Sequence, residues 1–579
     1  SSNADTYNVA IGYNAGNAIT TGTDNTLIGG LAGDAITTGA NNTAVGQQAA
    51  TAITTASNNI AIGADSLKAT TTGTANVAVG FAALEANTTA DNNTAVGFTA
   101  LLSNTTGASN TAVGSGALDA NTTASENTAV GFDALGANTT GDGNTAIGVK
   151  AMDANTVGDR NVAVGAEALG NMNPSTNADM YNVAVGYQAG LSITTASFNT
   201  AVGGLALDAN TTGAGNVAVG YNAGGALTTG GNNTVVGTNA LITQTTATNN
   251  TAIGSGAMEA NTSGSNSVAV GLGALAANTT GSSNVAVGSS ALDALTTGNQ
   301  NVAVGKNALG SQSTGSQAVA VGHGALAVAN SRSNIAIGYH SSVNLTSGDS
   351  CVTIGYEAGE DITTGSHHTL VGFRAGMNIT TSNYNTIMGS NASASMTTGS
   401  QNTCYGYGSG TSIVDGSNNL MFGFNANVSA SGRSELVIAT AEVGKGDGTG
   451  FIAPPGNGNL FQGNNTTTFA TTSDRRIKKN IVDNNSGLEK INQIQVRNFE
   501  YKTAEEITEL PTHTAIKKEG LQLGVIAQEV EDILPDIVNT EDTGCKTVNA
   551  DNMTWYLVNA VKELSAQVEE LKTKLNEGE

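Results

Sequence analysis

A serine and a lysine five residues apart open the most highly charged part of the sequence. Ser473 and Asp474 precede the run Arg-Arg-Ile-Lys-Lys at 475–479. A serine hydroxyl becomes a nucleophile when a base takes its proton, and a lysine acts as that base only in its neutral form. Like charge from the neighbouring Arg and Lys side chains favours the neutral form of Lys478. The spacing is compatible with a Ser473 and Lys478 pair, whereas a solvated basic run accounts for the same residues without any chemistry.

Charge also divides the chain at this point. The 579 residues carry a net charge of -24, yet charged side chains occupy only 33 of the first 473 positions, against 33 of the last 106. A long segment so poor in Lys and Arg is unsuited to binding phosphate backbones. No apolar run approaches the ~20 residues of a membrane span, and no signal peptide opens the chain. We therefore expect no nucleic-acid partner and no membrane insertion.

A 17-residue repeat fills the first part of the chain. The phrase Asn-Thr-Ala-Val-Gly recurs, and its final residue, which we call the register glycine, occurs 25 times between Gly12 and Gly423. The step is 17 residues except for one of 21 after Gly165 and one of 16 after Gly322. A constant repeat length over more than 400 residues is not expected of a disordered low-complexity chain. The repeat predicts about 25 coils of a β-solenoid or β-roll, stacked ~4.8 Å apart into a rod of roughly 120 Å. The longer step, near Pro174, indicates a break between two sub-rods.

Each repeat alternates in type along its first residues. In 93–98 (Asn-Thr-Ala-Val-Gly-Phe), Thr, Val and Phe share one face of a strand, and Asn, Ala and Gly share the other. The phrase Asn-Thr-Thr-Gly then marks a turn. We expect two short strands and two turns per coil. The small Ala/Gly face suits close approach of a neighbouring chain, and solenoid coils with few apolar residues need partners, so self-association around a three-fold axis is expected.

Two columns of side chains should run along the rod. The residue four before the register glycine is Asn in 21 of the 25 copies, the exceptions being Ser267, Ala318, Cys351 and His368. Stacked amides of this kind can bond to one another and to turn backbone. The residue after the register glycine is aromatic in 11 copies: Tyr13, Phe81, Phe98, Phe132, Tyr187, Tyr221, Tyr339, Tyr356, Phe373, Tyr407 and Phe424. Packing of these rings in the core is the favoured interpretation, and a stacking platform for sugar rings is the alternative.

The last part of the chain ends in a heptad pattern. Apolar residues fall at spacings of 4, 3, 4, 3 and 4, which predicts a coiled-coil helix. They are Leu557, Val561, Leu564, Val568, Leu571 and Leu575. Alternating Val and Leu lean toward a two-stranded coil. The single tryptophan, Trp555, should pack against the body of the terminal domain.

Two resemblances follow from these patterns. The phrase Asn-Ser-Val-Ala-Val-Gly at 266–271 resembles the head repeats of trimeric bacterial adhesins, and this likeness extends over roughly 1–439. The segments 473–481 (SDRRIKKNI) and 524–530 (GVIAQEV), then Leu-Pro at 534–535 and the final helix, resemble the endosialidase-type intramolecular chaperone and serine auto-protease domain that ends many bacteriophage tailspikes and fibres. That resemblance implies a domain that trimerises, guides assembly of the preceding β-fibre and cuts itself away.

The second resemblance also assigns roles to residues. It implies Ser473 as the nucleophile and Lys478 as its general base, with His513 as a candidate assisting residue. Attack by Ser473 on its own carbonyl would close a four-membered ring, attack on the Thr472 carbonyl a five-membered ring, and attack on another chain no ring. The family pattern implies cleavage beside Ser473, at the bond to Asp474 to within one residue.

Together these observations predict a mainly β protein: a trimeric β-solenoid shaft (1–439), a linker or cap (440–472), and a small α+β chaperone auto-protease domain (473–579). We expect a structural viral fibre, located on the virion, that contacts other virion proteins and a host-surface receptor, with a glycan as one candidate. The only enzymatic activity expected is a single self-cleavage. Cofactors and metals are not expected, since Cys351, Cys404 and Cys545 are widely spaced. A bacterial adhesin, a capsid or neck decoration fibre and a threonine-rich ice-binding solenoid are the alternatives.

Overall fold

The computed structural model describes residues 6–444, 446–453, 460–462, 475–510, 516, 518–541 and 544–578. The chain divides into two compact units, Ser1–Thr472 and Ser473–Glu579, which we call the shaft and the terminal domain. Within the described residues, no helix is both long enough and apolar enough to cross a membrane.

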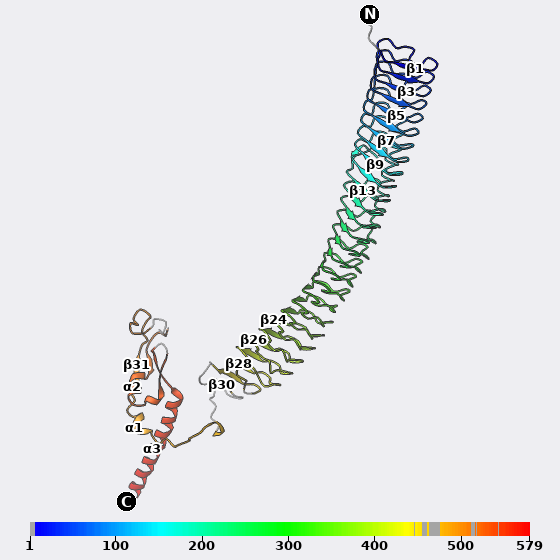
Figure 1. The fold of residues 1–579 in the computed structure, drawn as a ribbon. Helices are drawn as coiled ribbons and strands as arrows, with labels where there is room; N and C mark the ends of the chain where they lie inside the picture. Colours follow the sequence, from blue (N-terminus) through cyan, green and yellow to red (C-terminus); the bar gives the residue numbers. More distant parts are fainter. Residues whose placement is uncertain are drawn as a thin grey trace. The chain divides into compact units, whose positions relative to one another are not determined.

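The shaft is a stack of coils, each of which contributes one short strand to a continuous parallel sheet (Figure 1). The stacked strands are β1 (Val9–Ile11), β2 (Thr26–Ile28), β3 (Thr43–Val45), β4 (Ile60–Ile62), β5 (Val77–Val79), β6 (Thr94–Val96), β7 (Thr111–Val113), β8 (Thr128–Val130), β9 (Thr145–Ile147), β11 (Val162–Val164), β13 (Val183–Val185), β14 (Thr200–Val202), β15 (Val217–Val219), β16 (Thr234–Val236), β17 (Thr251–Ile253), β18 (Val268–Val270), β19 (Val285–Val287), β20 (Val302–Val304), β21 (Val319–Val321), β22 (Ile335–Ile337), β23 (Val352–Ile354), β24 (Thr369–Val371), β25 (Thr386–Met388), β26 (Thr403–Tyr405), β27 (Leu420–Phe422), β28 (Leu436–Ala439), β29 (Gly450–Ala453) and β30 (Leu460–Gln462). Every described pairing in this sheet is parallel except that of β29 with β30.

The predicted β-solenoid and its 17-residue register are confirmed. Thr94 pairs with Thr111 and Val96 with Val113, and the same offset recurs along the stack. The stack also includes β28, which makes a further coil beyond the 25 counted in the sequence. Ala439 stands where that coil would have its register glycine, so the sequence pattern missed it.

The expectation of two strands per coil is wrong. Outside the 21-residue step, where two coils each carry an additional two-residue strand, the assigned strands are one per coil, and the rest of each described coil is mostly turn. In the coil after β5, Ala82, Leu84 and Asn92 have φ angles of 56°, 54° and 61°. Left-handed residues at these positions reverse the direction of the chain, so most of the rest of the coil is turn and not extended backbone.

The two strand faces have the opposite orientation to the one expected, in which the aromatic residues pack in the core and the small Ala/Gly face meets a neighbouring chain. Asn93 and Ala95 are fully buried inside the coil, whereas Val96 is 36% exposed and Phe98 is 58% exposed. The interior is narrow and is filled by the small strand residues together with a leucine from the facing turn, such as Leu101. The prediction that the aromatic column packs in a core is therefore wrong within a single chain. The outward Thr, Val, Ile and aromatic side chains form an apolar surface along the shaft, which we call the strand face.

The predicted asparagine ladder is confirmed. The backbone N–H of Asn110 donates to Oδ1 of Asn93 (2.9 Å), and its Nδ2 donates to the carbonyl oxygen of Ala124 (2.9 Å). Oδ1 of Asn110 in turn accepts from the backbone N–H of Asn127 (3.0 Å). Each amide thus joins three successive coils and satisfies buried backbone groups that have no sheet partner.

His368 takes an asparagine's place in this ladder. Its Nε2 lies 2.9 Å from the Ser382 carbonyl, and its Nδ1 accepts from the Asn385 backbone N–H (3.3 Å). This arrangement needs a neutral ring. Burial lowers the pKa of His368 from 6.5 to about 4, because the charged form would lose its hydration.

Replacing this histidine should remove a pH dependence. A lowered pKa stabilises the folded state above pH 6.5, and that stabilisation is lost as the pH falls toward 4. His368→Asn restores the ladder residue, so between pH 7 and pH 4 the unchanged chain should lose about 3 kcal/mol of local stability relative to the variant. Hydrogen exchange of peptides covering 351–389, compared between the two proteins at each pH, measures this difference. Equal protection at pH 4 would contradict the prediction.

The terminal domain is small and mixed in structure. Its described elements are the 3-10 helix η1 (Arg475–Ile477), α1 (Leu488–Ile491), β31 (Arg497–Phe499), β32 (Gln522–Gly524), α2 (Ala527–Glu531), the 3-10 helix η3 (Pro535–Ile537), β33 (Val538–Thr540), β34 (Lys546–Val548) and α3 (Ala550–Asn576). Strands β31 and β32 pair antiparallel, as do β33 and β34. Val530, Leu534, Ile537 and Tyr556 form its core.

Helix α3 confirms the predicted terminal helix, and Asn549 caps it by accepting from the Asn552 N–H. Trp555 does not pack against the domain as expected, since its side chain is 64% exposed. The next residue takes that role: Tyr556 is buried, and its hydroxyl donates to Oδ2 of Asp536 (2.7 Å). All six heptad residues are exposed along the helix.

Candidate functional site

The predicted catalytic residues are only partly described. Ser473, Asp474 and His513 lie outside the described residues, so their relation to Lys478 stays a prediction. Lys478 directly follows η1, and its backbone N–H donates to the carbonyl oxygen of Arg475 (3.2 Å). Its side chain is exposed.

The chain that follows Lys478 is fixed to helix α3. Nδ2 of Asn559 donates to the Asn484 carbonyl (2.6 Å), and the Leu488 backbone N–H donates to Oε2 of Glu563 (2.9 Å). Gly487 lies so close to the helix that an added Cβ would be 2.4 Å from the Ala560 nitrogen. The chain is thus fixed to α3, the helix with the heptad seam, from Asn484 onward, six residues after the predicted base Lys478.

Seven of the eleven rings in the aromatic column stack with a neighbour in the column: Phe81, Phe98, Tyr339, Tyr356, Phe373, Tyr407 and Phe424. Ring centroids of Tyr339 and Tyr356 are 5.2 Å apart, and those of Tyr356 and Phe373 are 5.3 Å apart, with nearly parallel planes. Rings inside such a stack have both faces covered by neighbouring rings and expose only their edges. A ring covered on both faces, such as Tyr356, therefore does not suit a platform on which a sugar would stack.

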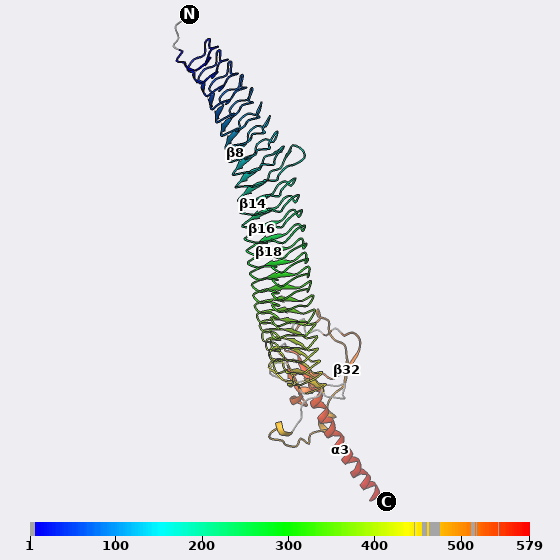
Figure 2. The ribbon, with the colours of Figure 1, turned by 90° about the vertical axis from the view of Figure 1, so that its right-hand side faces the viewer.

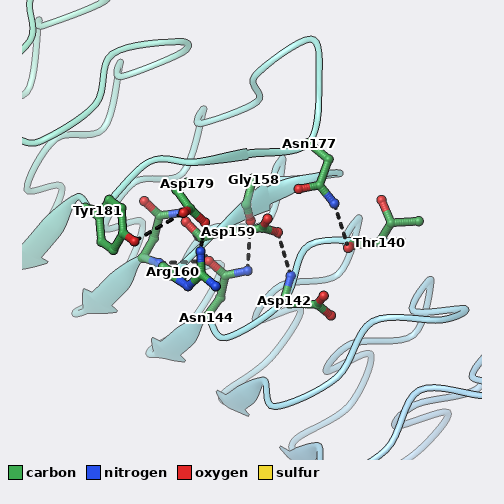
Figure 3. Close-up of polar contacts among 10 residues, drawn as sticks. Thr140, Asp142, Asn144, Gly158, Asp159, Arg160, Asn177, Asp179 and Tyr181 are labelled. Atoms are coloured by element: carbon green, nitrogen blue, oxygen red, sulfur yellow. Dashed lines mark hydrogen bonds and ion pairs between the residues drawn. The ribbon is translucent and has the colours of Figure 1, made fainter.

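The four-residue insertion gathers polar side chains on one side of the shaft (Figure 3). Here β10 (Gly158–Asp159) and β12 (Ala178–Asp179) pair as a separate parallel sheet. Arg160 forms an ion pair with Asp179, whose carboxylate also accepts from the Tyr181 hydroxyl (3.1 Å). Nδ2 of Asn177 reaches back to the Thr140 carbonyl (3.5 Å).

The prediction that the insertion near Pro174 breaks the shaft into two sub-rods is wrong, because the stack continues across it. Strands β11 and β13 pair across it in register, Val162 with Val183. The loop instead projects beyond its neighbours, between β8 and β14 in Figure 2. The sequence signals available for this cluster were the 21-residue step and the charged Arg160 and Asp179 within a shaft poor in charge.

Comparison with known proteins identifies the terminal domain. Residues 473–539 match a peptidase family described as the chaperone of endosialidase. This match confirms the resemblance drawn from the motifs of the segment.

The chain is also similar to long tail fibre proteins of phages. It is 29% identical over 131 residues to the long tail fiber protein Gp37 of Enterobacteria phage Ox2, which is 22% of this chain and 46% of the relative. The same protein of Enterobacteria phage M1 is 29% identical over 133 residues, covering 22% of this chain and 47% of the relative. The aligned part thus spans about half the length of these curated relatives.

Proposed function

We propose that this chain is a structural fibre protein of a bacteriophage virion, and that it mediates attachment to the host surface. The observation that carries the proposal is the combination of a long β-solenoid with a chaperone-of-endosialidase domain at its end, since the family match and both phage relatives point to fibres. Immunogold electron microscopy with antibodies against the shaft tests it. Label on a projecting fibre of the virion is the expected result, and label confined to unassembled protein would contradict the proposal.

The fibre assembles as a homotrimer. Two apolar surfaces support this, each exposed in the single chain: the strand face, which runs along the described coils of the shaft, and the heptad seam of α3. A partner for the strand face must repeat with the same spacing as the coils, and another copy of this chain meets that requirement. Covering both surfaces removes them from water and stabilises the assembly.

The terminal domain cleaves itself from the shaft after assembly. The Ser473 hydroxyl attacks the scissile carbonyl beside it, in its own chain or in another copy, and Lys478 takes the serine proton and passes it to the departing amine as the C–N bond breaks. Water then hydrolyses the ester that remains. The tether between 484–488 and α3 supports a link between trimerisation and cleavage, because the seam of that helix is completed only by other copies. Once the terminal domain that guided assembly has been released, an unfolded shaft cannot reassemble, so the assembled shaft persists by kinetic stability.

A charge in the heptad seam should block assembly. Leu564→Asp replaces a side chain whose burial contributes about 2 kcal/mol per chain with a carboxylate that repels its copies. Size-exclusion chromatography with light scattering should show mainly unassembled, uncleaved chain. Ala566→Asp adds the same charge on the opposite side of α3, where the residue is also exposed, and should assemble normally. Normal assembly of both variants would contradict the role of the seam.

A further inference from the structure

Two exposed aromatic side chains lie next to the insertion, in a column that elsewhere is mostly polar or small. Tyr181 and Phe198 are each five residues before a register glycine, where other coils carry mainly Asn, Ser, Gln or Gly. Their rings stack with centroids 5.8 Å apart. Tyr181 is 47% exposed and Phe198 is 60% exposed. Neither ring fills the core of the shaft.

The backbone makes these aromatic residues costly. Tyr181 has a φ of 52° and Phe198 a φ of 62°, the left-handed region that suits Asn and Gly and strains bulky side chains. Leu84 also has a positive φ (54°), but its side chain is fully buried, so packing offsets the strain. The exposed rings are not enclosed in this way, and their contacts are with each other and with the Arg160 guanidinium. The coil imposes this backbone conformation, since residues at the same position of other coils also have positive φ angles, so a bulky exposed ring at this position calls for a reason other than the fold.

One ring face in this group is open. The Arg160 guanidinium lies over Tyr181, 6.0 Å from the ring centroid, and Phe198 covers the other side of Tyr181. The next residue of the column beyond Phe198 is Gly215, which has no side chain to cover the outer face of the phenyl ring. Oδ1 of the Asn232 amide lies beside this space, since a Cβ added to Gly215 would be 2.7 Å from it.

Polar groups surround the rings. Asp179 holds Arg160 and the Tyr181 hydroxyl in place. Asp159 accepts from the Asp142 backbone N–H (2.7 Å), and burial, with a smaller contribution from the Asp142 carboxylate, raises the pKa of Asp159. Three carboxylates against one guanidinium leave the site with negative charge, which disfavours an anionic ligand.

This polar side of the shaft is the one that stays accessible in the proposed assembly. The exposed insertion residues Asn173, Ser175, Thr176 and Asn177 are all polar. The apolar strand face is the surface that other copies would cover.

We propose that the open face of the Phe198 ring, with Asn232 beside it, binds an uncharged saccharide of the host surface, and that Arg160 and Asp179 act by holding Tyr181 against the other face of this ring. The aliphatic C–H face of a sugar ring stacks on the open face of Phe198, whose π-electrons attract it. Oδ1 of Asn232, the amide atom nearest to this space, accepts from a sugar hydroxyl. The choice of ligand rests on the proposed attachment function, and the site itself rests on the exposed, strained rings.

Two variants test the site without disturbing the shaft. Phe198→Asn and Tyr181→Asn install the residue that the column uses elsewhere, one that tolerates the left-handed backbone. Tyr384→Asn makes the same change in the same column at a distant coil, where Tyr384 is also exposed with a φ of 60°. The labelled full-length fibre is applied to a printed array of bacterial surface oligosaccharides, both uncharged ones and ones that carry sialic or uronic acid.

The unchanged protein should bind at least one uncharged oligosaccharide, Phe198→Asn and Tyr181→Asn should lose at least tenfold of that signal, and Tyr384→Asn should retain it. Absence of binding to every uncharged saccharide, binding of acidic saccharides only, or equal binding by the Phe198 variant would overturn the inference. Trimer formation and fragment release are measured on the same preparations. If both occur without saccharide binding, the inference fails while the proposed fibre stands.

Discussion

The Ser473→Ala variant should remain at full length when the unchanged chain releases its terminal domain. Cleavage at the bond between Ser473 and Asp474 frees 106 residues, a fragment of about 12 kDa at ~110 Da per residue. Without the hydroxyl there is no nucleophile, so the loss of cleavage should be complete. Denaturing electrophoresis separates the two products, and intact-mass measurement of the fragment should place its first residue at Asp474 or one residue away.

Two lysine variants separate the base from the surrounding positive charge. Lys478→Ala should abolish cleavage as completely as the serine variant, whereas Lys479→Ala, which removes the same charge one position on, should still cleave. If both lysine variants cleave, Lys478 is not the base. If Ser473→Ala itself releases the fragment, the self-cleavage mechanism is wrong.

A methyl group on one register glycine should disrupt the shaft. Gly97 has a φ of 148°, and an added Cβ would lie 2.2 Å from the carbonyl oxygen of Gly114 in the next coil. Backbone in both coils would have to move, and we expect Gly97→Ala to destabilise the local stack by about 4 kcal/mol or more. Limited proteolysis of the purified protein should show new cleavage around this coil.

Gly30 provides the matched control. It lies next to a register glycine, its φ is outside the left-handed region, and an added Cβ would meet nothing within 4 Å. Gly30→Ala should therefore leave the proteolysis pattern unchanged or slightly improve stability by restricting the unfolded chain. Equal sensitivity of the two variants would contradict the close approach of successive glycines.

The regular part of the shaft was predictable because its glycines and asparagines recur at a constant spacing of 17 residues. The register glycines mark where successive backbones come into contact, and the Asn93 and Asn110 amides recur because buried backbone groups need them. The direction of the strand faces was not predictable in the same way. Alternation separates Ala95 from Val96 but does not say which side is enclosed, and that depends on how narrow the closed coil is.

Other features depend on contacts that a one-dimensional pattern lacks. The further coil at β28 was missed because Ala439 replaces its register glycine. The cluster at Arg160 and Asp179 depends on a loop that returns to coils already formed. In the terminal domain, motifs identified the family of 473–539. Neither the tether of 484–488 to α3 nor the exchange of roles between Trp555 and Tyr556 could be read from spacing alone.

The central claim is that copies of this chain complete each other along the strand face. Native mass spectrometry of the processed protein, with its shaft intact, tests it most directly. Three copies of the shaft in one particle, which persist after the terminal domain has been removed, are the predicted result. A folded shaft that stays soluble as a single copy, with its strand face open to water, would contradict it.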